Sequence, residues 1–265
     1  MKVFISADIE GVNHINEWSE TDSSSPLYRE FQEQLTKEVS CASIGANKAG
    51  AKTIFIKDAH DSGCNLIFSK LPDNAILHRG WEGSPKMMME GLDSTFDAVI
   101  FIGYHSGMLS EGNSLAHTMS LKIHRISING EIASEFLINA YYASLIKVPI
   151  VFLSGDLALT ETAKKTIPAL STVATKTGLH GANTSIHPNR TNQEIEDKVY
   201  SALSRDYSNN IIKLPEEFYI EIEYRTHQEA YSASFFPGCK LIKSNVISFH
   251  SKNYYDVLVL FKFVL

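Results

Sequence analysis

Hydrophobic residues follow two different spacings along the chain, and the two alternate. Short, nearly continuous apolar runs at 2–9, 53–57, 97–103 and 148–155 predict strands. Between the first two runs, apolar residues recur every three or four positions, as in an amphipathic helix. Nearly continuous apolar strands are typical of a sheet that is covered on both faces. The pattern therefore predicts an α/β protein with a mixed, mostly parallel sheet and helices on both faces.

The clearest predicted helix covers residues 26–49. Its apolar positions are spaced by four, four, three and four residues: Phe31, Leu35, Val39, Ala42 and Ala46. Gly50 follows directly, and glycine is the residue that most easily takes the left-handed conformation at the C-terminus of a helix. We therefore expect the helix to end there.

The middle of the chain predicts a hairpin and further α/β elements. Residues 118–128 alternate between apolar and polar side chains and precede Asn129 and Gly130, a typical hairpin turn. The elements expected after the turn are helices at 134–146 and 159–166, a strand near 171–175, and a helix that begins at Pro188 or at Thr191, where Thr191 and Glu194 match a capping box.

The last fifty residues predict a smaller α+β portion. Alternation returns from residue 218, followed by a short helix near 227–234, a strand at 241–249 and a terminal helix. We therefore expect a main α/β domain at 1–212, with the C-terminal portion at 213–265 packed on it, unless the two form one continuous domain.

The charge balance makes some classes of partner improbable. The 265 residues include 24 Lys and Arg against 30 Asp and Glu, a formal net charge of −6, so we expect neither nucleic acid nor a membrane surface as partner. No apolar run approaches the ~20 residues of a membrane span, and the N-terminus does not resemble a secretory signal. Three cysteines without CxxC spacing suggest neither a disulfide framework nor a zinc ribbon. We expect a cytoplasmic protein.

Metal-competent side chains follow three of the predicted strands. Asp8 and Glu10 end the first strand, and His60 and His105 follow two later ones. The carboxyl ends of parallel strands form the ligand crevice of an open α/β sheet, so these residues can converge there. Two carboxylates on one side of a strand end repel unless they share a cation or a proton, and with histidine they form a ligand set that zinc accepts. Taken singly, the acids fit a solvated strand end and each histidine fits a structural role.

Two further residues are candidates for the same crevice. His117 lies in a polar, glycine-containing segment twelve residues after His105, where it can act as a general base, a general acid, a nucleophile or a fifth ligand. Glu135 begins a predicted helix and either faces the crevice or is favoured there by the helix dipole. His180 and His187 fit a surface loop better than a metal site. The chain has no Walker A motif, no GxGxxG after a strand and no GxSxG elbow.

Taken together, the segments around these residues resemble a known family. They are SADIEGV at 6–12, KDAHDSGCNL at 57–66, MEGLDSTFDAVIFIGYHS at 89–106, AHTMS at 116–120 and SEFLINAYYAS at 134–144. In this order they resemble the zinc-dependent D-aminopeptidases of the dipeptide-transport-operon type. The likeness extends over essentially the whole chain.

The resemblance implies a two-zinc centre and an oligomer. The implied ligands are Asp8, Glu10, His60, His105 and Glu135. Asp8 would bridge two zinc ions per subunit, with Glu10 and His60 completing one site and His105 and Glu135 the other. His117 would be the catalytic residue, acting with metal-activated water. Family members form rings of ten subunits whose active sites face an inner chamber, which would restrict substrates to short peptides.

The resemblance thus implies a cytoplasmic dizinc metallo-aminopeptidase, a homodecamer that hydrolyses short peptides with N-terminal D-residues such as D-Ala-D-Ala. One alternative is another dimetal hydrolase, either an aminopeptidase for L- or unusual peptides or a phosphoesterase. Phosphoester chemistry usually needs Arg or Lys near the metals, and only Lys57, Arg79 and Lys122 are close to the proposed ligands in sequence. The other alternative is a catalytically silent, ring-forming relative, because fold alone does not establish activity.

Overall fold

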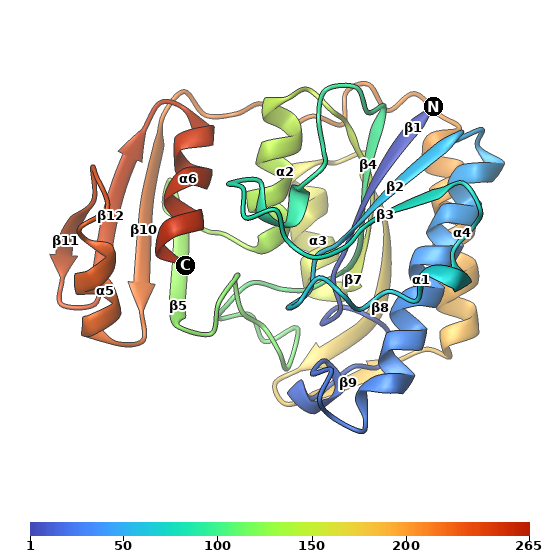
Figure 1. The fold of residues 1–265 in the computed structure, drawn as a ribbon, viewed down its shortest axis with the longest axis horizontal. Coiled ribbons are helices and arrows are strands. Elements are labelled where there is room, and N and C mark those ends of the chain that lie inside the picture. The colour runs from blue at the N-terminus through green and yellow to red at the C-terminus, as the bar shows by residue number, and fades with distance from the viewer.

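The computed structural model describes residues 1–265 and places the first sheet, sheet A, at the centre of the larger part of the molecule (Figure 1). Its strand order is β3-β2-β1-β4-β7-β8-β9. The strands are β1 (Lys2–Ala7), β2 (Thr53–Asp58), β3 (Ala75–His78), β4 (Ala98–Tyr104), β7 (Ile150–Asp156), β8 (Ser171–Leu179) and β9 (Ala182–Ser185). All neighbours pair in parallel except β8 and β9, which are antiparallel. The predicted mixed, mostly parallel sheet is confirmed.

Helices cover both faces of sheet A, as Figure 1 shows. On one face, α1 (Tyr28–Lys48) and α4 (Pro188–Leu203) pack against each other and against the sheet, and their apolar residues share one hydrophobic cluster with those of β1, β2 and β4. On the other face lie α2 (Glu135–Leu145) and α3 (Leu157–Thr166), whose apolar residues belong to a second cluster. The buried strands explain the nearly continuous apolar runs in the sequence.

A second, antiparallel sheet, sheet B, forms the other end of the molecule. Its order is β11-β12-β10-β5-β6, built from β5 (Ile123–Ile128), β6 (Glu131–Ile132), β10 (Phe218–Tyr224), β11 (Lys240–Lys243) and β12 (Val246–Ser251). The helices α5 (His227–Ala233) and α6 (Tyr254–Val264) accompany it, and α6 contacts α2, β10 and β12. Three short 3-10 helices, η1 (Trp18–Glu20), η2 (Phe68–Lys70) and η3 (Met87–Met89), lie in loops around sheet A.

Sheet B draws its strands from two distant parts of the chain. The hairpin β5–β6 comes from the middle of the sequence, yet β5 pairs with β10 near the C-terminus, with Ile126 opposite Ile222. The second hydrophobic cluster also runs from α2 and α3 into β10, β12 and α6 without interruption. A boundary at 212/213 would separate strands that pair with each other, so the division into two domains stays a prediction.

Several local predictions are corrected by the structure. The single strand expected at 241–249 is the hairpin β11–β12, because the chain turns between Lys243 and Val246. The strand expected from 118 begins only at Ile123. Of the two starts predicted for helix α4, the one at Pro188 is confirmed, with His187 as the N-cap, and the capping box at Thr191 is not used. The strands β3 and β9 were not predicted, because each has only four residues and β9 is mostly polar.

The ends of β1 and β4 approach each other too closely for side chains. A Cβ atom on Gly11 would stand 1.7 Å from the carbonyl oxygen of Tyr104, and one on Gly103 would stand 2.2 Å from that of Asp8. Gly103 also has φ +69°, in the left-handed region that glycine adopts without strain. Glycine at both positions lets the loop after β1 pack directly on the end of β4. This contact places the side chains after β1 next to those after β4.

Glu38 is a fully buried acid on α1 with one unpaired oxygen. We expect it to make the free energy of unfolding depend on pH. Its Oε1 accepts hydrogen bonds from Asn13 N and Gln34 Nε2, both at 3.0 Å, while Oε2 has no partner. Burial raises the pKa of Glu38 from 4.5 to about 7. The folded state therefore binds a proton more tightly than the unfolded state, so Glu38 lowers the free energy of unfolding as pH rises from about 4.5 to about 7.

We expect Glu38→Gln to remove this loss. The free energy of unfolding of the variant minus that of the unsubstituted protein should increase by about 2–3 kcal/mol from pH 5 to pH 8. The reason is that one pKa unit corresponds to about 1.4 kcal/mol. Urea unfolding at both pH values measures the difference, and Glu30→Gln on the exposed face of α1 is the control. A difference in stability that does not change with pH would contradict the expectation.

Candidate metal centre

The candidate ligands lie together at the carboxyl edge of sheet A. Asp8 and Glu10 follow β1, His60 follows β2, and His105 directly follows β4. These strands are neighbours in the order β2-β1-β4. The chain runs outward from β1 through β2 to β3 and then returns to place β4 on the other side of β1, which makes the edge between β1 and β4 a topological switch point. Ligands of open α/β sheets bind at such points.

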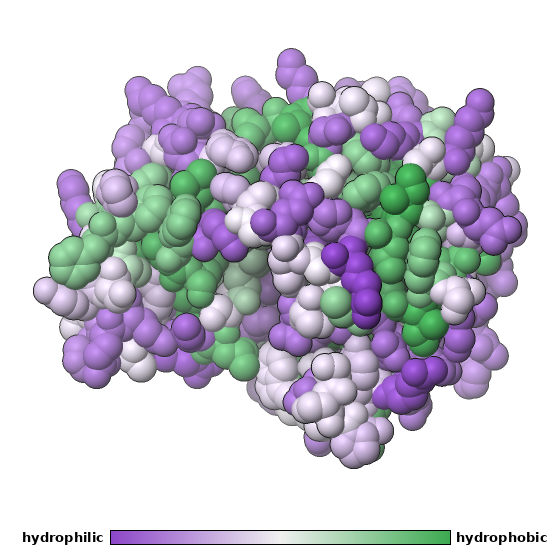
Figure 2. All heavy atoms as spheres, in the orientation of Figure 1, coloured by the Kyte–Doolittle hydropathy of each residue, from purple (hydrophilic) through white to green (hydrophobic).

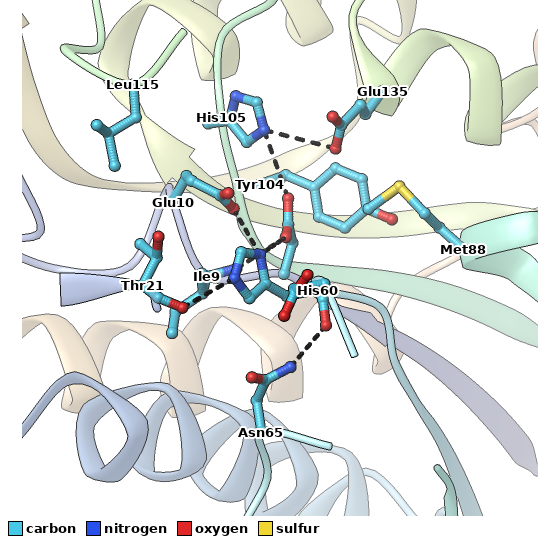
Figure 3. A network of polar contacts seen from close by, with 12 residues as sticks. Ile9, Glu10, Thr21, His60, Asn65, Met88, Tyr104, His105, Leu115 and Glu135 are labelled. Carbon is cyan, nitrogen blue, oxygen red and sulfur yellow. Dashed lines mark hydrogen bonds and ion pairs between the residues drawn. The ribbon is translucent and has the colours of Figure 1, made fainter. Parts of the chain in front are cut away.

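Asp8 faces a histidine with each of its two oxygens. Its Oδ1 lies 3.5 Å from His60 Nδ1, and its Oδ2 lies 3.6 Å from His105 Nε2. Glu10 Oε2 lies 3.2 Å from the same nitrogen of His60, and both side chains point toward each other in Figure 3. The carboxylate of Asp8 therefore lies between two possible metal ligands, His60 on one side and His105 on the other.

Glu135 and His117 complete the cluster. Glu135 is the first residue of α2, whose N-cap Ser134 accepts a hydrogen bond from Leu137 N. The Oε2 of Glu135 lies 3.5 Å from His105 Nε2 (Figure 3), and its Oε1 lies 3.5 Å from His117 Nε2. The rings of His105 and His117 are stacked with their centroids 4.4 Å apart. The six residues predicted from the sequence thus meet in one place, and their individual roles stay predictions.

Backbone carbonyls fix the orientation of all three histidines. His60 Nε2 contacts Thr21 O at 3.1 Å, His105 Nδ1 contacts Ser106 O at 2.9 Å, and His117 Nδ1 contacts Leu115 O at 3.0 Å. A carbonyl oxygen only accepts, so each of these nitrogens carries the hydrogen. In a neutral ring the other nitrogen then has a lone pair, and in all three rings that nitrogen is directed at carboxylate oxygens. Hydrogen bonds of this kind orient metal-binding histidines in proteins.

The cluster needs positive charge at its centre. Asp8, Glu10, His105 and Glu135 are buried, and three of their atoms, Asp8 Oδ2, Glu10 Oε2 and His105 Nε2, have no hydrogen-bond partner. Burial and the neighbouring Glu10 raise the pKa of Asp8 well above its usual value. Burial lowers the pKa of His105, but Glu135 and the other carboxylates outweigh it and raise that pKa to about 10. Bound protons or metal ions can supply the charge, and the unpartnered donor atoms suit metal ions.

Buried side chains hold the loop between His105 and His117 in place. The carboxylate of Asp156, which is also the N-cap of α3, accepts hydrogen bonds from Ser106 N at 2.7 Å and from Asn113 Nδ2 at 3.1 Å. Asn113 Nδ2 also donates to the carbonyl oxygen of Glu10. No pattern in the sequence indicates that Asp156 and Asn113 are positioning residues, since neither lies beside a ligand in the sequence.

The metal-competent cluster opens into a cavity of about 350 Å³. Its walls comprise Asp8, Glu10, Ala59, His60, Asp61, Trp81, Gly83, Ser84, Met87, Met88, Glu90, His117, Met119, Glu135 and Lys262. The volume is at the lower end of the range for small-molecule sites in proteins. Lys262 comes from α6, so the terminal helix contributes to the same cavity as the strands of sheet A. No pattern in the sequence indicated this contribution.

The remaining sequence candidates lie elsewhere. His180 and His187 are exposed, and neither lines the cavity; the segment between them forms β9 and the turn before it, where a loop was predicted. The cations named for a phosphoester site, Lys57, Arg79 and Lys122, do not line the cavity either. Lys57 is buried behind the wall, where it bonds to Gly80 O. These three positions give no support to phosphoester chemistry, and Lys262 is the one lysine or arginine on the cavity wall.

The fold and the site together define a class of protein: an α/β protein with a metal-competent centre that opens into a cavity of small-molecule size, as expected of a metallohydrolase. The chain matches the peptidase M55 family, described as D-aminopeptidase, over residues 1–263. The chain therefore belongs to the D-aminopeptidase family. The match confirms the resemblance and the prediction of a metallopeptidase.

A curated sequence and a solved structure of D-aminopeptidase, both from Bacillus subtilis, are similar to the chain. A D-aminopeptidase of strain 168 is 27% identical over 255 residues, which cover 96% of this chain and 92% of the relative. The solved structure of the Zn-dependent D-aminopeptidase DppA, described as a self-compartmentalizing protease, has a TM-score of 0.91 and 26% identity, and the match covers 98% of this chain and 95% of that one. The predicted fold class is confirmed by this likeness. None of the helices combines the length and apolar character needed to cross a membrane.

Proposed function

We propose that the chain is a zinc-dependent aminopeptidase that hydrolyses short peptides with N-terminal D-residues. The observation that carries this proposal is the cluster of three histidines and three carboxylates at the switch point of sheet A, in which lone pairs and unpartnered oxygens converge. The zinc dependence of the similar B. subtilis enzyme supports zinc as the metal. Membership of the D-aminopeptidase family supports the class of substrate.

The donor set fits two zinc ions per subunit. Asp8 would contact both ions, because its two oxygens face two different histidines. Glu10 and His60 would complete one site, and His105 and Glu135 the other. When bound, such ions polarise the scissile carbonyl and lower the pKa of nearby water. The nitrogen and oxygen atoms of this set are ligands that zinc prefers, and the contacts of His60 and His105 with backbone carbonyls support the proposal.

His117 is the proposed catalytic residue. Its Nδ1 donates to Leu115 O, which leaves the lone pair on Nε2 free to take up a proton or to attack directly. The residue lines the cavity together with Glu135, and its ring forms an edge-to-face contact with the Trp18 ring, with the centroids 5.3 Å apart. His117 also forms a metal-competent group with His105 and Glu135, so a ligand role is the alternative.

Metal analysis and peptide hydrolysis on the same preparation test the proposal. We expect near two zinc ions per chain and cleavage of D-Ala-D-Ala in preference to L-Ala-L-Ala, with activity lost on chelation and restored by zinc. Preference for the L-peptide would contradict the stereospecificity. Failure of the protein to bind zinc when zinc is supplied would contradict the metal centre itself.

We also propose a homodecameric ring located in the cytoplasm. Apolar surface gathers over the end of the molecule formed by sheet B and its helices (Figure 2), where Phe235, Leu241, Ile242 and Phe263 are exposed. Exposed apolar patches of this kind mark contacts between proteins. The description of DppA as self-compartmentalizing supports assembly of subunits around a chamber. Light scattering tests the oligomeric state, and a monomer mass would contradict the ring.

A further inference from the structure

The cavity carries one positive side chain other than histidine. Its walls contain the carboxylates of the metal-competent cluster together with Asp61 and Glu90, but only one lysine and no arginine. The lysine is Lys262, in the last turn of α6. A cation in the last turn is generally favoured by the helix dipole. That preference explains why a lysine is tolerated at this point of the helix, but it does not explain why α6 directs it into the cavity.

Lys262 is free to bind a ligand. Its side chain is exposed and forms no ion pair or hydrogen bond within the chain, although Glu90 lines the same cavity. The Nζ atom lies 4.0 Å from the position that a Cβ atom on Gly83 would occupy, which places it over the loop 79–84. The ammonium group therefore stands at the cavity wall without a partner of its own.

The loop beneath Lys262 is held firmly. Glu90 accepts hydrogen bonds from Glu82 N at 2.8 Å and from Ser84 N at 2.9 Å, so it pins the loop on both sides of Gly83. Lys57 Nζ lies 3.6 Å from the same carboxylate and 3.8 Å from the centroid of the Trp81 ring. Because Glu90 is already engaged with this loop, it does not compete for Lys262. A fixed wall lowers the entropic cost of binding a ligand against it.

We propose that Lys262 binds the terminal carboxylate of the peptide substrate and so selects di- or tripeptides with a free carboxyl group. The inference rests on the proposed function, because it assumes a peptide in this cavity. A short peptide carries an ammonium group at one end and a carboxylate at the other. The carboxylate is attracted by Lys262, the one lysine or arginine side chain on the cavity wall, and this attraction orients the substrate. The volume of about 350 Å³ suits a ligand of that length.

Equilibrium binding tests the assignment without relying on turnover. The ligands are the reduced-amide analogue of D-Ala-D-Ala, in which CH₂–NH replaces the scissile amide, as free acid and as C-terminal carboxamide. Titration calorimetry at low salt, which limits screening of an exposed charge, should show the zinc-loaded protein binding the acid about tenfold more tightly than the carboxamide. Lys262→Gln should bind the two analogues equally, with the affinity for the carboxamide unchanged. Lys262→Arg should keep most of the preference.

Lys243→Gln is the matched control, because Lys243 is also exposed and unpaired but does not line the cavity. This variant should keep the full preference for the acid. The assignment would be overturned if Lys262→Gln kept the preference, or if the unsubstituted protein bound both analogues equally or bound neither.

Turnover of D-Ala-D-Ala and of its C-terminal carboxamide separates this inference from the proposed function. For the Lys262→Gln variant we expect KM for the free acid to rise about tenfold with kcat nearly unchanged, and the carboxamide to be unaffected. If the unsubstituted protein hydrolyses neither peptide, the proposed function fails while the binding measurement still decides the role of Lys262. A fall in kcat for both peptides would instead place Lys262 in support of the fold and overturn the assignment.

Discussion

Replacing His117 with alanine should abolish peptide hydrolysis while the zinc content stays near two ions per subunit. The five proposed ligands are unchanged in this variant, in which Glu135 loses its contact with His117 Nε2 and His105 loses the stacked His117 ring. Loss of a positioned general acid or base typically costs about 10²–10⁴-fold in rate. We therefore expect a fall of at least about 100-fold in kcat, measured with D-Ala-D-Ala alongside elemental analysis.

His180→Ala is the control, since His180 is exposed and lies outside the cavity. It should retain both zinc and activity. Loss of one zinc ion together with activity in the His117 variant would make His117 a ligand, the role that its proximity to His105 and Glu135 also permits.

Replacing Asp8 with asparagine should remove both metal ions. The side chain keeps its size, but it loses the charge and one of the two oxygens that face His60 and His105. Replacing a residue that only orients a metal ligand already lowers metal affinity by about 10–100-fold. Removal of a carboxylate shared by two ions should lower the affinity for each by more than that.

The measurement is the zinc content after dialysis against a weak chelator. Asp61→Asn is the matched control, because Asp61 lines the same cavity next to His60 but forms no ion pair with a histidine. That variant should keep two ions. One tightly bound ion in the Asp8 variant would contradict the bridging role and assign Asp8 to a single site.

The centre of the fold was predictable because its signals are local. The strands of sheet A that carry Asp8, His60 and His105 are buried on both faces, so each forms a continuous apolar run that ends in a polar residue. The rule that ligands gather at the carboxyl ends of parallel strands then placed these residues together. Glu135 and the role of His117 depended on the resemblance to a family, because acids at helix starts and histidines in loops are common in proteins that bind no metal.

The rest of the molecule was not predictable because it depends on contacts between distant segments. Nothing in the alternation at 123–128 shows that β5 pairs with β10 about ninety residues later. Asp156 looks like an ordinary residue at a strand end, yet it anchors the loop between two of the site histidines through Ser106 and Asn113. Lys262 reaches the cavity only because α6 docks beside α2.

The split origin of sheet B has a consequence for synthesis of the protein. The β5–β6 hairpin leaves the ribosome long before β10, so β5 has an unpaired edge while the next ninety residues are made. Glu135 follows this hairpin directly, whereas Lys262 belongs to α6, which is made after every strand of both sheets. The nascent chain therefore cannot complete the cavity beside the metal-competent cluster before α6 has emerged. The part of the cavity wall that carries Lys262 is therefore in place only after both sheets and this helix have been made and packed together.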